Sequence, residues 1–433
     1  MPAEPPPPPE TRPLPLPIPD PSLVLLVGVS GCGKSTFART HFAPLEVLSS
    51  DACRALVAND ENDQSATAAA FEVLHLVAAK RLERRLLTVV DATNVRPEAR
   101  RPLVELARRH HLPAVAIVLD LPEALCAARG RARTDRDVGP HVLRRQLTQL
   151  QKSLPHLERE GFRSVHRLRA EADVAAAAVV REPLPVDRRA DVGPFDVVGD
   201  VHGCADELLA LLAALGYVRD AAGAHRHPDG RRVVFLGDLV DRGPRIPDVL
   251  RVAMAMADAG SALALPGNHD DKLARRLRGR DVKVAHGLAE SLAQLERETP
   301  EFRRRVVAFV DGLPSHYVLD GGQLVVAHAG MTEALQGRDS RRVRDFALYG
   351  ATTGELDALG LPVRRDWAAE YHGAAHVVYG HTPVAVPEWR NRTMNVDTGC
   401  VFGGRLTALR WPERELVSVP AQRRYAEPGR PFP

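Results

Sequence analysis

Three short apolar runs in the C-terminal half of this chain each end in a cluster of Asp, Asn and His residues. The clusters read GDVHG, GDLVDRG and GNHD. A strand that stops at such a cluster carries its side chains to the edge of a sheet, where the sites of α/β proteins form. Carboxylate and carbonyl oxygens bind hard divalent ions, and imidazole adds affinity for Mn, Fe, Ni or Zn. Asp200 and His202 can therefore bind one metal ion, and Asp238 can bridge it to a second.

The second ion needs further ligands, and Asn268 can supply one through its amide oxygen. The order GDxHG, GDxVDRG and GNH resembles the binuclear metallophosphoesterases, a family that carries two more histidines later in the chain. This sequence has them as His328 in LVVAHAG and His381 in VVYGHTP. Strand-end turns that happen to hold these residue types are the alternative, and five motifs in the expected order argue against it.

Another set of polar residues lies beside these motifs and can act on a substrate. Asp241 can fix the tautomer of His269, and Arg242 can hold a phosphate with its guanidinium fork. Asp397 lies where a strand meets a turn in NVDTGC, and we expect it to face the same site. The pattern as a whole favours hydrolysis of a phosphate ester.

The N-terminal half contains a different chemical motif, in SLVLLVGVSGCGKST. A buried strand runs into a match to the phosphate-binding loop G-x-x-x-x-G-K-[ST]. In such a loop the main-chain N–H groups surround nucleotide phosphates, the lysine reaches the β and γ phosphates, and the serine hydroxyl joins Mg²⁺. A glycine-rich turn without nucleotide is the alternative. The predicted ATP-binding residues are Gly28, Gly31, Gly33, Lys34, Ser35 and Thr36, with Ser35 as the Mg²⁺ ligand.

Two further strands of this half end at residues that can take part in phosphoryl transfer. The strand in PLEVLSS ends at Asp51, which can accept a proton from an attacking hydroxyl, and Arg54 follows one helical turn later. The residues alone leave open whether Asp51 is instead only the N-cap of the next helix. The strand in LLTVVDATN ends at Asp91, where P-loop proteins keep a carboxylate for the magnesium shell.

Arginines crowd the segment CAARGRARTDRDV. In small P-loop kinases a lid folds over ATP at this place, and its arginines neutralise charge on the transferred phosphoryl group. The alternative is a solvated basic face, which applies most to Arg131 and Arg136.

Composition sets broad limits on the function of the chain. The 433 residues, with 45% hydrophobic and 26% charged residues, fit a soluble protein of two or three domains, and a net charge of +3 is too small to predict nucleic-acid binding. No apolar run reaches membrane-spanning length and no secretory signal is evident, so we expect a cytoplasmic protein without membrane contacts. The five cysteines are scattered without a C-x-x-C pair, which argues against a disulfide framework or a zinc knuckle.

Shifts in composition divide the chain into segments. Prolines dominate the first residues, and VVREPLPVDRRADVGP mixes proline with charge and lacks periodicity. The predicted fold is α/β, with a kinase-type parallel sheet and flanking helices followed by an α/β metallophosphoesterase sandwich. The predicted segments are a disordered tail (1–20), a P-loop kinase domain (21–182), a linker (183–194), a metallophosphoesterase domain (195–420) and a C-terminal tail (421–433).

The two halves together resemble bacterial polynucleotide kinase-phosphatase, a family that heals broken RNA ends. The matching motifs include GxSGxGKSTFA, SSDxCR, VDATN, GDVHG, GDLVDRGP, GNHD, YGHTP and NVDTGCVFGG, spread over residues 22–420. For the N-terminal half the resemblance implies a polynucleotide 5′-hydroxyl kinase that uses ATP and Mg²⁺. Asp51 would be its general base, Arg54 would contact the phosphoacceptor, and Arg129 and Arg133 would act from the lid.

For the C-terminal half the resemblance implies a polynucleotide 3′-phosphatase and 2′,3′-cyclic phosphodiesterase that uses Mn²⁺ or Ni²⁺. Arg242 and His269 would bind the phosphate and stabilise the leaving group, and Asp397 would be an active-site carboxylate. The implied metal ligands are Asp200, His202 and Asp238 for one ion, and Asp238, Asn268, His328 and His381 for the other.

The resemblance also implies partners. These are RNA or alternatively DNA ends, and the family suggests a tendency to form homodimers. Longer members carry a C-terminal ligase domain, whereas this chain stops soon after the phosphatase and has no K-x-D-G motif. We therefore expect a separate ligase or RNA-modifying enzyme to act with it.

Two other functions fit parts of the sequence. GDxVDRG and GNH also occur in protein Ser/Thr phosphatases and in dinucleoside polyphosphate hydrolases, to which a nucleotide-sensing P-loop domain would then be fused. Alternatively, the P-loop half is a regulatory module that binds nucleotide and transfers no phosphate. The P-loop half argues against the first alternative, and Asp51 and Arg54 argue against the second.

Overall fold

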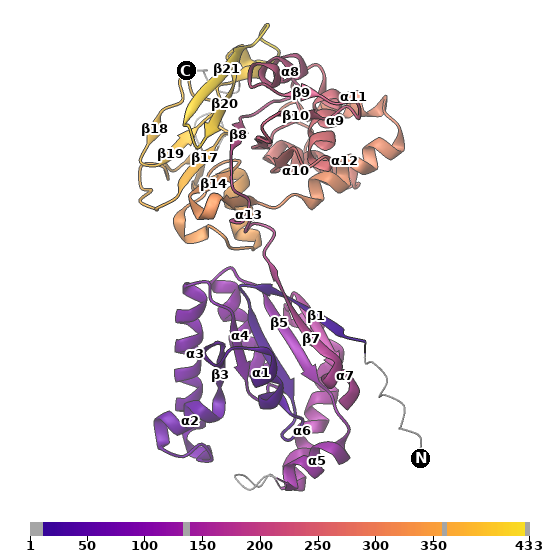
Figure 1. The fold of residues 1–433 in the computed structure, drawn as a ribbon, viewed down its shortest axis with the longest axis vertical. Coiled ribbons are helices and arrows are strands. Elements are labelled where there is room, and N and C mark those ends of the chain that lie inside the picture. The colour runs from indigo at the N-terminus through magenta and orange to yellow at the C-terminus, as the bar shows by residue number, and fades with distance from the viewer. Residues whose placement is uncertain (1–11, 133–138, 357–361, 429–433) are drawn as a thin grey trace, which may run out of the picture. The chain divides into compact units, whose positions relative to one another are not determined.

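The computed structural model describes residues 12–132, 139–356 and 362–428. The chain divides into two compact units, with the boundary between Leu184 and Pro185 (Figure 1). Each unit is built from helices around β-sheets, which confirms the predicted α/β class. Among the described residues, no helix is long and apolar enough to cross a membrane.

The N-terminal unit is built around a parallel sheet of five strands in the order β3–β4–β2–β5–β6. The two strands LVLLVG and AVAIVL are buried along their whole length, as expected for the centre of a parallel sheet covered on both faces. The strands are β2 (Leu23–Gly28), β3 (Val47–Ser49), β4 (Thr88–Asp91), β5 (Ala114–Leu119) and β6 (Ser164–Leu168).

Helices connect these strands and cover the sheet. The α4 helix shows the pattern clearly, because its apolar residues Leu103, Val104 and Leu106 are buried while its arginines at 101 and 108 face solvent. The helices are α1 (Lys34–His41), α2 (Ser50–Ala58), α3 (Thr67–Glu83), α4 (Pro97–Arg109), α5 (Glu123–Arg131), α6 (Pro140–Ser153) and α7 (Glu171–Ala176), with short 3₁₀ turns at Pro44–Glu46, Gln64–Ala66 and Leu154–Glu160.

The prediction of a disordered tail over 1–20 is wrong for its last residues. Strand β1 (Leu14–Asp20) pairs in parallel with β7 (Ala177–Pro183), and both Leu16 and Ile18 are buried. The prolines at 15, 17 and 19 alternate with apolar residues, so they share one side of the strand. A strand with a single partner needs N–H donors only at alternate residues, and the prolines therefore do not prevent pairing. Residues 1–11 lie outside the described part.

The C-terminal unit contains two mixed sheets of five strands each, in the orders β12–β11–β8–β20–β21 and β13–β14–β17–β19–β18. The strands of the first are β8 (Phe195–Val198), β11 (Arg232–Phe235), β12 (Ala262–Ala264), β20 (Arg405–Trp411) and β21 (Glu415–Pro420). Those of the second are β13 (His316–Leu319), β14 (Leu324–Ala327), β17 (His376–Tyr379), β18 (Trp389–Arg390) and β19 (Thr393–Asn395).

Successive side chains of each strand point to opposite faces of its sheet. Phe195 and Val197 of β8 pack with Val326 and Val378 in a core between the sheets, whereas Val198 joins a core under the helices. The second sheet packs its outer face on α13. The remaining elements are α8 (Ala205–Ala214), α9 (Ile246–Asp258), α10 (Asn268–Leu277), α11 (Leu288–Glu296), α12 (Pro300–Gly312), α13 (Arg341–Tyr349), the short strands β9 (Val218–Arg219), β10 (His225–Arg226), β15 (Thr352–Leu356) and β16 (Pro362–Arg364), and 3₁₀ turns at Asp320–Gly322, Glu333–Leu335 and Cys400–Phe402.

Two segments that were predicted to be connecting or terminal are parts of this unit. Residues 186–188 bond to the main chain of Val318, and Val186 is buried. The expected tail from 421 packs on the helix core, where the main-chain N–H of Tyr425 donates to the carbonyl oxygen of Val401 at 3.0 Å. Apolar and aromatic side chains in otherwise polar segments explain both departures, because their burial outweighs the local proline and charge content.

Candidate metal centre and phosphate-binding loop

Five strand ends of the C-terminal unit deliver polar side chains to one place. Strands β8, β11 and β12 run parallel, so their carboxyl ends share an edge and carry Asp200, Asp238 and Asn268. In the second sheet β14 and β17 are also parallel, and they end just before His328 and His381. The structure therefore brings together side chains from motifs that lie far apart in the sequence.

One group of donor atoms is formed by Asp238, His328 and His381, which lie within 4.8 Å of one another. The Nε2 atom of His328 lies 2.9 Å from Nδ1 of His381 and 3.5 Å from Oδ2 of Asp238. The same Nε2 atom is 3.0 Å from Oδ1 of Asn268. These four residues are the set that the sequence assigned to the second ion.

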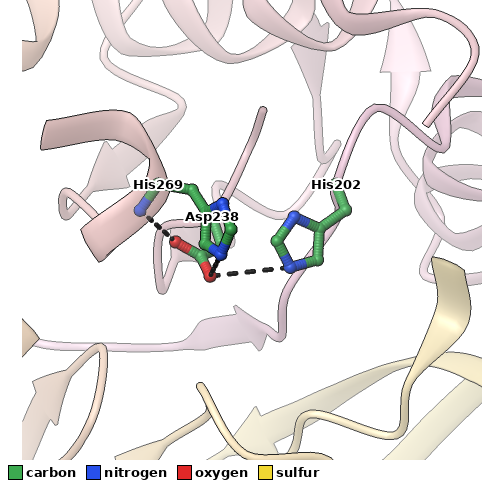
Figure 2. A group of neighbouring side chains, drawn as sticks. All are labelled: His202, Asp238 and His269. Atoms are coloured by element: carbon green, nitrogen blue, oxygen red, sulfur yellow. Dashed lines mark hydrogen bonds and ion pairs between the residues drawn. The ribbon is translucent and has the colours of Figure 1, made fainter. Parts of the chain in front are cut away.

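A second group is formed by His202, Asp238 and His269, also within 4.8 Å (Figure 2). The Nε2 atoms of His202 and His269 lie 3.5 Å and 3.9 Å from Oδ2 of Asp238. Asp238 is thus shared by both groups, as a bridging ligand requires. The family resemblance implies that His269 acts on the leaving group, and the structure adds that its ring faces the shared carboxylate.

Asp200 lies at the edge of the two groups and belongs to neither set of three donors. Its Oδ2 accepts a hydrogen bond from the main-chain N–H of His381 at 3.1 Å, and its Oδ1 is 3.9 Å from Nδ1 of His328. Asp397 also faces this place, because a Cβ built on Gly380 would meet both Asp200 and Asp397 within 3.4 Å.

The electrostatics of this centre fit divalent cations. Burial and the neighbouring Asp397 raise the pKa of Asp200 well above its usual value, and burial raises the pKa of Asp397 to about 7. Burial would also raise the pKa of Asp238, but the surrounding imidazoles outweigh it and lower that pKa. Burial lowers the pKa of His202 and His381 well below the usual value, so both rings are neutral and able to bind metal.

Hydrogen bonds fix the imidazoles with their metal-binding nitrogens pointing inward. Nδ1 of His202 donates to the carbonyl oxygen of Val240 at 2.7 Å, and Nδ1 of His328 donates to that of Leu236 at 3.1 Å. Nε2 of His381 is buried without a hydrogen-bond partner among the described residues. Metal-ligating histidines hydrogen-bond their second nitrogen as His202 and His328 do, so the donor set fits two divalent ions.

Backbone conformation at the centre departs from ordinary geometry. His202, Asp238, Asp241, Arg242 and His381 all have positive φ, between 44° and 75°. Such residues cost on the order of 1–3 kcal/mol each and collect at functional sites, where the surrounding fold holds them. This backbone strain arises because each chain segment turns sharply after its strand to direct the side chain toward a common point.

Arg242 and His269 lie beside the two donor groups. Nη2 of Arg242 is 3.0 Å from Nε2 of His269, and Nη1 is 2.5 Å from Nε2 of His202. Nδ1 of His269 donates to Oδ2 of Asp241 at 2.6 Å. The predicted contact between Asp241 and His269 is therefore present, and a phosphate that binds Arg242 would lie next to the metal ligands.

One residue of this centre was missed by sequence reasoning. Ser291 on α11 is fully buried, donates its hydroxyl to Oδ1 of Asp241 and accepts the main-chain N–H of Asp241 at 3.0 Å. Gln294 on the same helix donates to the carbonyl oxygen of Gly243 at 2.9 Å. The helical insert between the GNHD and AHAG motifs thus holds the loop that orients His269. No local motif marks Ser291, because its partner is distant in sequence.

In the N-terminal unit, β2 leads into the predicted phosphate-binding loop and α1. Gly33 precedes α1 with a φ of 95°, a left-handed conformation that favours glycine. A Cβ at Gly28 would lie 2.6 Å from Sγ of Cys32, so a side chain there would clash. Nζ of Lys34 donates to the carbonyl oxygens of Gly28 and Val29 at 3.0 and 2.8 Å. Gly31, Gly33, Lys34, Ser35, Thr36 and Asp91 line one open cleft.

The structure excludes one of the two roles left open for Asp51, that of helix N-cap. The N-cap of α2 is Ser49, whose hydroxyl accepts the main-chain N–H of Asp51 at 3.2 Å. The Asp51 carboxylate instead accepts Nη1 of Arg54 at 2.6 Å, and both residues line the cleft of the phosphate-binding loop. Nε of Arg54 is buried without a partner among the described residues, so this guanidinium still has a free donor.

The predicted lid arginines are placed only in part. Nη1 of Arg129 donates to the carbonyl oxygen of Cys32 at 3.4 Å, and Nη2 pairs with Glu171 at 2.5 Å. Arg131 also lines the cleft, whereas Arg133 and Arg136 lie outside the described residues.

Comparisons with known proteins agree with this division. A family model described as an AAA domain matches residues 23–157, and one described as a calcineurin-like phosphoesterase matches residues 193–385. The chain is 46%, 49% and 47% identical to proteins named Bis(5'-nucleosyl)-tetraphosphatase PrpE from Anoxybacillus flavithermus, Geobacillus thermodenitrificans and Bacillus subtilis. The alignments span 55%, 52% and 54% of this chain and 99%, 94% and 97% of those proteins.

Fold and site together define a P-loop domain followed by a metallophosphoesterase with hydrolase chemistry. Through its C-terminal half, the chain belongs to the calcineurin-like phosphoesterase family. The relatives cited match this half alone, so the narrower resemblance to polynucleotide kinase-phosphatase stays a prediction.

Proposed function

We propose that the C-terminal unit hydrolyses a phosphoanhydride bond in nucleotides of the dinucleoside tetraphosphate class. The observation that carries this proposal is Asp238, which both donor groups share beside Arg242 and His269. Relatives that carry the name tetraphosphatase match this unit over nearly their whole length, which supports the choice of substrate. This choice corresponds to one of the alternatives that the sequence left open.

In this proposal each residue has a defined task. Asp200, His202 and Asp238 would hold one divalent ion, and Asp238, Asn268, His328 and His381 a second. Such ions would supply an activated water and neutralise charge on the phosphate. Arg242 binds the phosphate with its guanidinium, which reaches both His202 and His269. His269 would lie beside the leaving oxygen and stabilise it, and Asp241 holds the ring in the required orientation.

For the N-terminal unit we propose ATP-dependent phosphoryl transfer with Mg²⁺. Lys34 and Ser35 would bind the nucleotide phosphates and the magnesium ion. Asp51 would take the proton of the acceptor hydroxyl, and Arg54, whose Nε has no partner among the described residues, would bind a phosphate of the acceptor.

A second candidate function is polynucleotide end healing, in which the kinase phosphorylates 5′-hydroxyl ends and the esterase removes 3′-phosphates or 2′,3′-cyclic phosphates. The pair of Asp51 and Arg54 in the cleft of the phosphate-binding loop favours it, because a hydrolase of soluble nucleotides does not need an acceptor site. Its substrates would be RNA or DNA ends, and a ligase from another chain would seal them.

One experiment compares the two candidates directly. Purified protein with Mg²⁺ and Mn²⁺ is given either a dinucleoside tetraphosphate, or ATP and an RNA oligonucleotide with a 5′-hydroxyl and a 2′,3′-cyclic phosphate. Products are resolved by mass. Asymmetric cleavage of the tetraphosphate without change at the RNA ends supports the first function. Change at both RNA ends with slow cleavage of the tetraphosphate supports the second and refutes the first.

Two variants test the assignment of residues to separate sites. Asp51→Ala should abolish phosphoryl transfer and leave hydrolysis intact, because Asp51 lies in the N-terminal unit. Asp238→Ala should abolish hydrolysis and leave phosphoryl transfer intact, because it removes the carboxylate that both donor groups share. Loss of both activities in either variant would contradict two independent sites.

A further inference from the structure

Three buried side chains outside the centre described above converge on one point. Ligand atoms of Cys204, Glu207 and Cys400 lie within 4.8 Å of one another, and all three residues are at most 2% exposed. Cys204 and Glu207 lie at the start of α8, whereas Cys400 begins the 3₁₀ turn after β19. Thiols and a carboxylate are a donor combination that binds metal when deprotonated.

One oxygen of the Glu207 carboxylate lacks a hydrogen-bond partner among the described residues. Its Oε1 accepts the Tyr425 hydroxyl at 2.7 Å and the main-chain N–H of Gln422 at 2.9 Å. Its Oε2 is buried and has no hydrogen-bond partner among the described residues. A buried carboxylate oxygen without a donor is costly, and a cation would remove that cost.

We propose that Cys204, Glu207 and Cys400 bind a structural metal ion, with Zn²⁺ as the best match. Thiolate sulfur selects zinc over magnesium or calcium, which prefer shells of oxygen ligands. Sγ of Cys204 donates to the carbonyl oxygen of His202 at 3.7 Å, and a water molecule would complete the tetrahedral shell. The two thiols release their protons to solvent as the ion binds.

This site is separate from the proposed catalytic ions but acts on their ligands. Neither catalytic donor group contains sulfur. Cys204 follows His202 by two residues, and Cys400 follows Asp397 by three. An ion held by both cysteines would cross-link the two loops that carry these residues, and Glu207 would join the C-terminal segment to them. The ion is expected to stabilise the centre and to take no part in the chemical step.

Cobalt substitution tests the proposal, because Co²⁺ bound to thiolate gives a sulfur-to-metal charge-transfer absorption that histidine and carboxylate ligands do not give. The full chain is produced in medium that contains Co²⁺, since the buried cluster is expected to load as the protein folds. We expect this absorption in the wild type and in Asp238→Ala, which removes only the catalytic carboxylate. Cys126→Ser is the matched control, since Cys126 is buried in the N-terminal unit.

Variants of the cluster should lose the signal. Cys400→Ser should abolish the absorption and lower the metal content by one ion per chain, and Glu207→Gln, which keeps the side-chain shape, should weaken it. If Cys400→Ser does not fold, the proposal is tested by the absorption spectra of the wild type and of Glu207→Gln. A wild type loaded with cobalt that lacks the sulfur absorption would overturn the proposal. So would a disulfide between Cys204 and Cys400 in a peptide map of unreduced protein.

Discussion

Ser291 offers a sharp test of how the centre is held together. Its hydroxyl makes two hydrogen bonds to Asp241, one to the carboxylate and one from the main-chain N–H at 3.0 Å. In Ser291→Ala both Asp241 groups lose a partner inside the protein. A hydrogen bond to a charged group contributes about 1.5–3 kcal/mol and a neutral one about 1 kcal/mol, so the free energy of unfolding should fall by about 2–4 kcal/mol.

Ser291→Ala should also lower the catalytic rate, because Asp241 orients His269. Asp241 holds Nδ1 of His269 at 2.6 Å, and a misplaced carboxylate leaves the ring free to rotate. Loss of such an orienting contact typically lowers activity about 10- to 100-fold. We expect the fall in kcat, measured on a generic phosphate monoester with saturating Mn²⁺, while KM changes little because Arg242 is untouched.

A matched serine separates this effect from plain destabilisation. Ser261 is also buried in the C-terminal unit, and its hydroxyl donates to the carbonyl oxygen of Met256 at 3.2 Å. Ser261→Ala should lower stability and leave kcat unchanged. The double variant Asp241→Ala/Ser291→Ala should have nearly the same kcat as Asp241→Ala alone, since both changes act on the same contact. A Ser291→Ala enzyme with full kcat, or losses that simply add, would refute the positioning role.

Three further outcomes can be checked with standard assays. Arg242→Lys should raise KM at least tenfold, since loss of a charged hydrogen bond costs about 1.5–3 kcal/mol and lysine cannot bind phosphate with two parallel donors; an unchanged KM argues against phosphate binding there. Glu160→Ala should destabilise the N-terminal unit by about 3–5 kcal/mol, because it leaves fully buried Arg100 without its carboxylate. All three tryptophans lie beyond residue 366, so circular dichroism should report this loss and tryptophan fluorescence should not. Chelation of divalent ions should stop hydrolysis and added Mn²⁺ should restore it; activity that survives chelation would exclude the two-ion site.

Several features of the fold could be predicted because they depend on local sequence. Apolar runs that end in polar clusters mark the carboxyl ends of strands, and parallel strands bring those ends together. The predictions that were wrong concern segments with mixed signals. Proline-rich residues 14–20 form an edge strand, and residues 421–428 pack on a core, since neighbours distant in sequence supply what the local composition lacks.

The sequence by itself determined the two chemical motif sets, the order of the two units and the identity of the residues that meet at the strand ends. Spacing within each motif encodes these features, because strand and turn geometry is local. Only the tertiary structure showed that Ser49 caps α2 while Asp51 pairs with Arg54 in the cleft, and that Ser291 supports Asp241. It alone brought Cys204 and Cys400 together, since contacts between distant segments depend on how helices and sheets pack and leave no periodic signal in the chain.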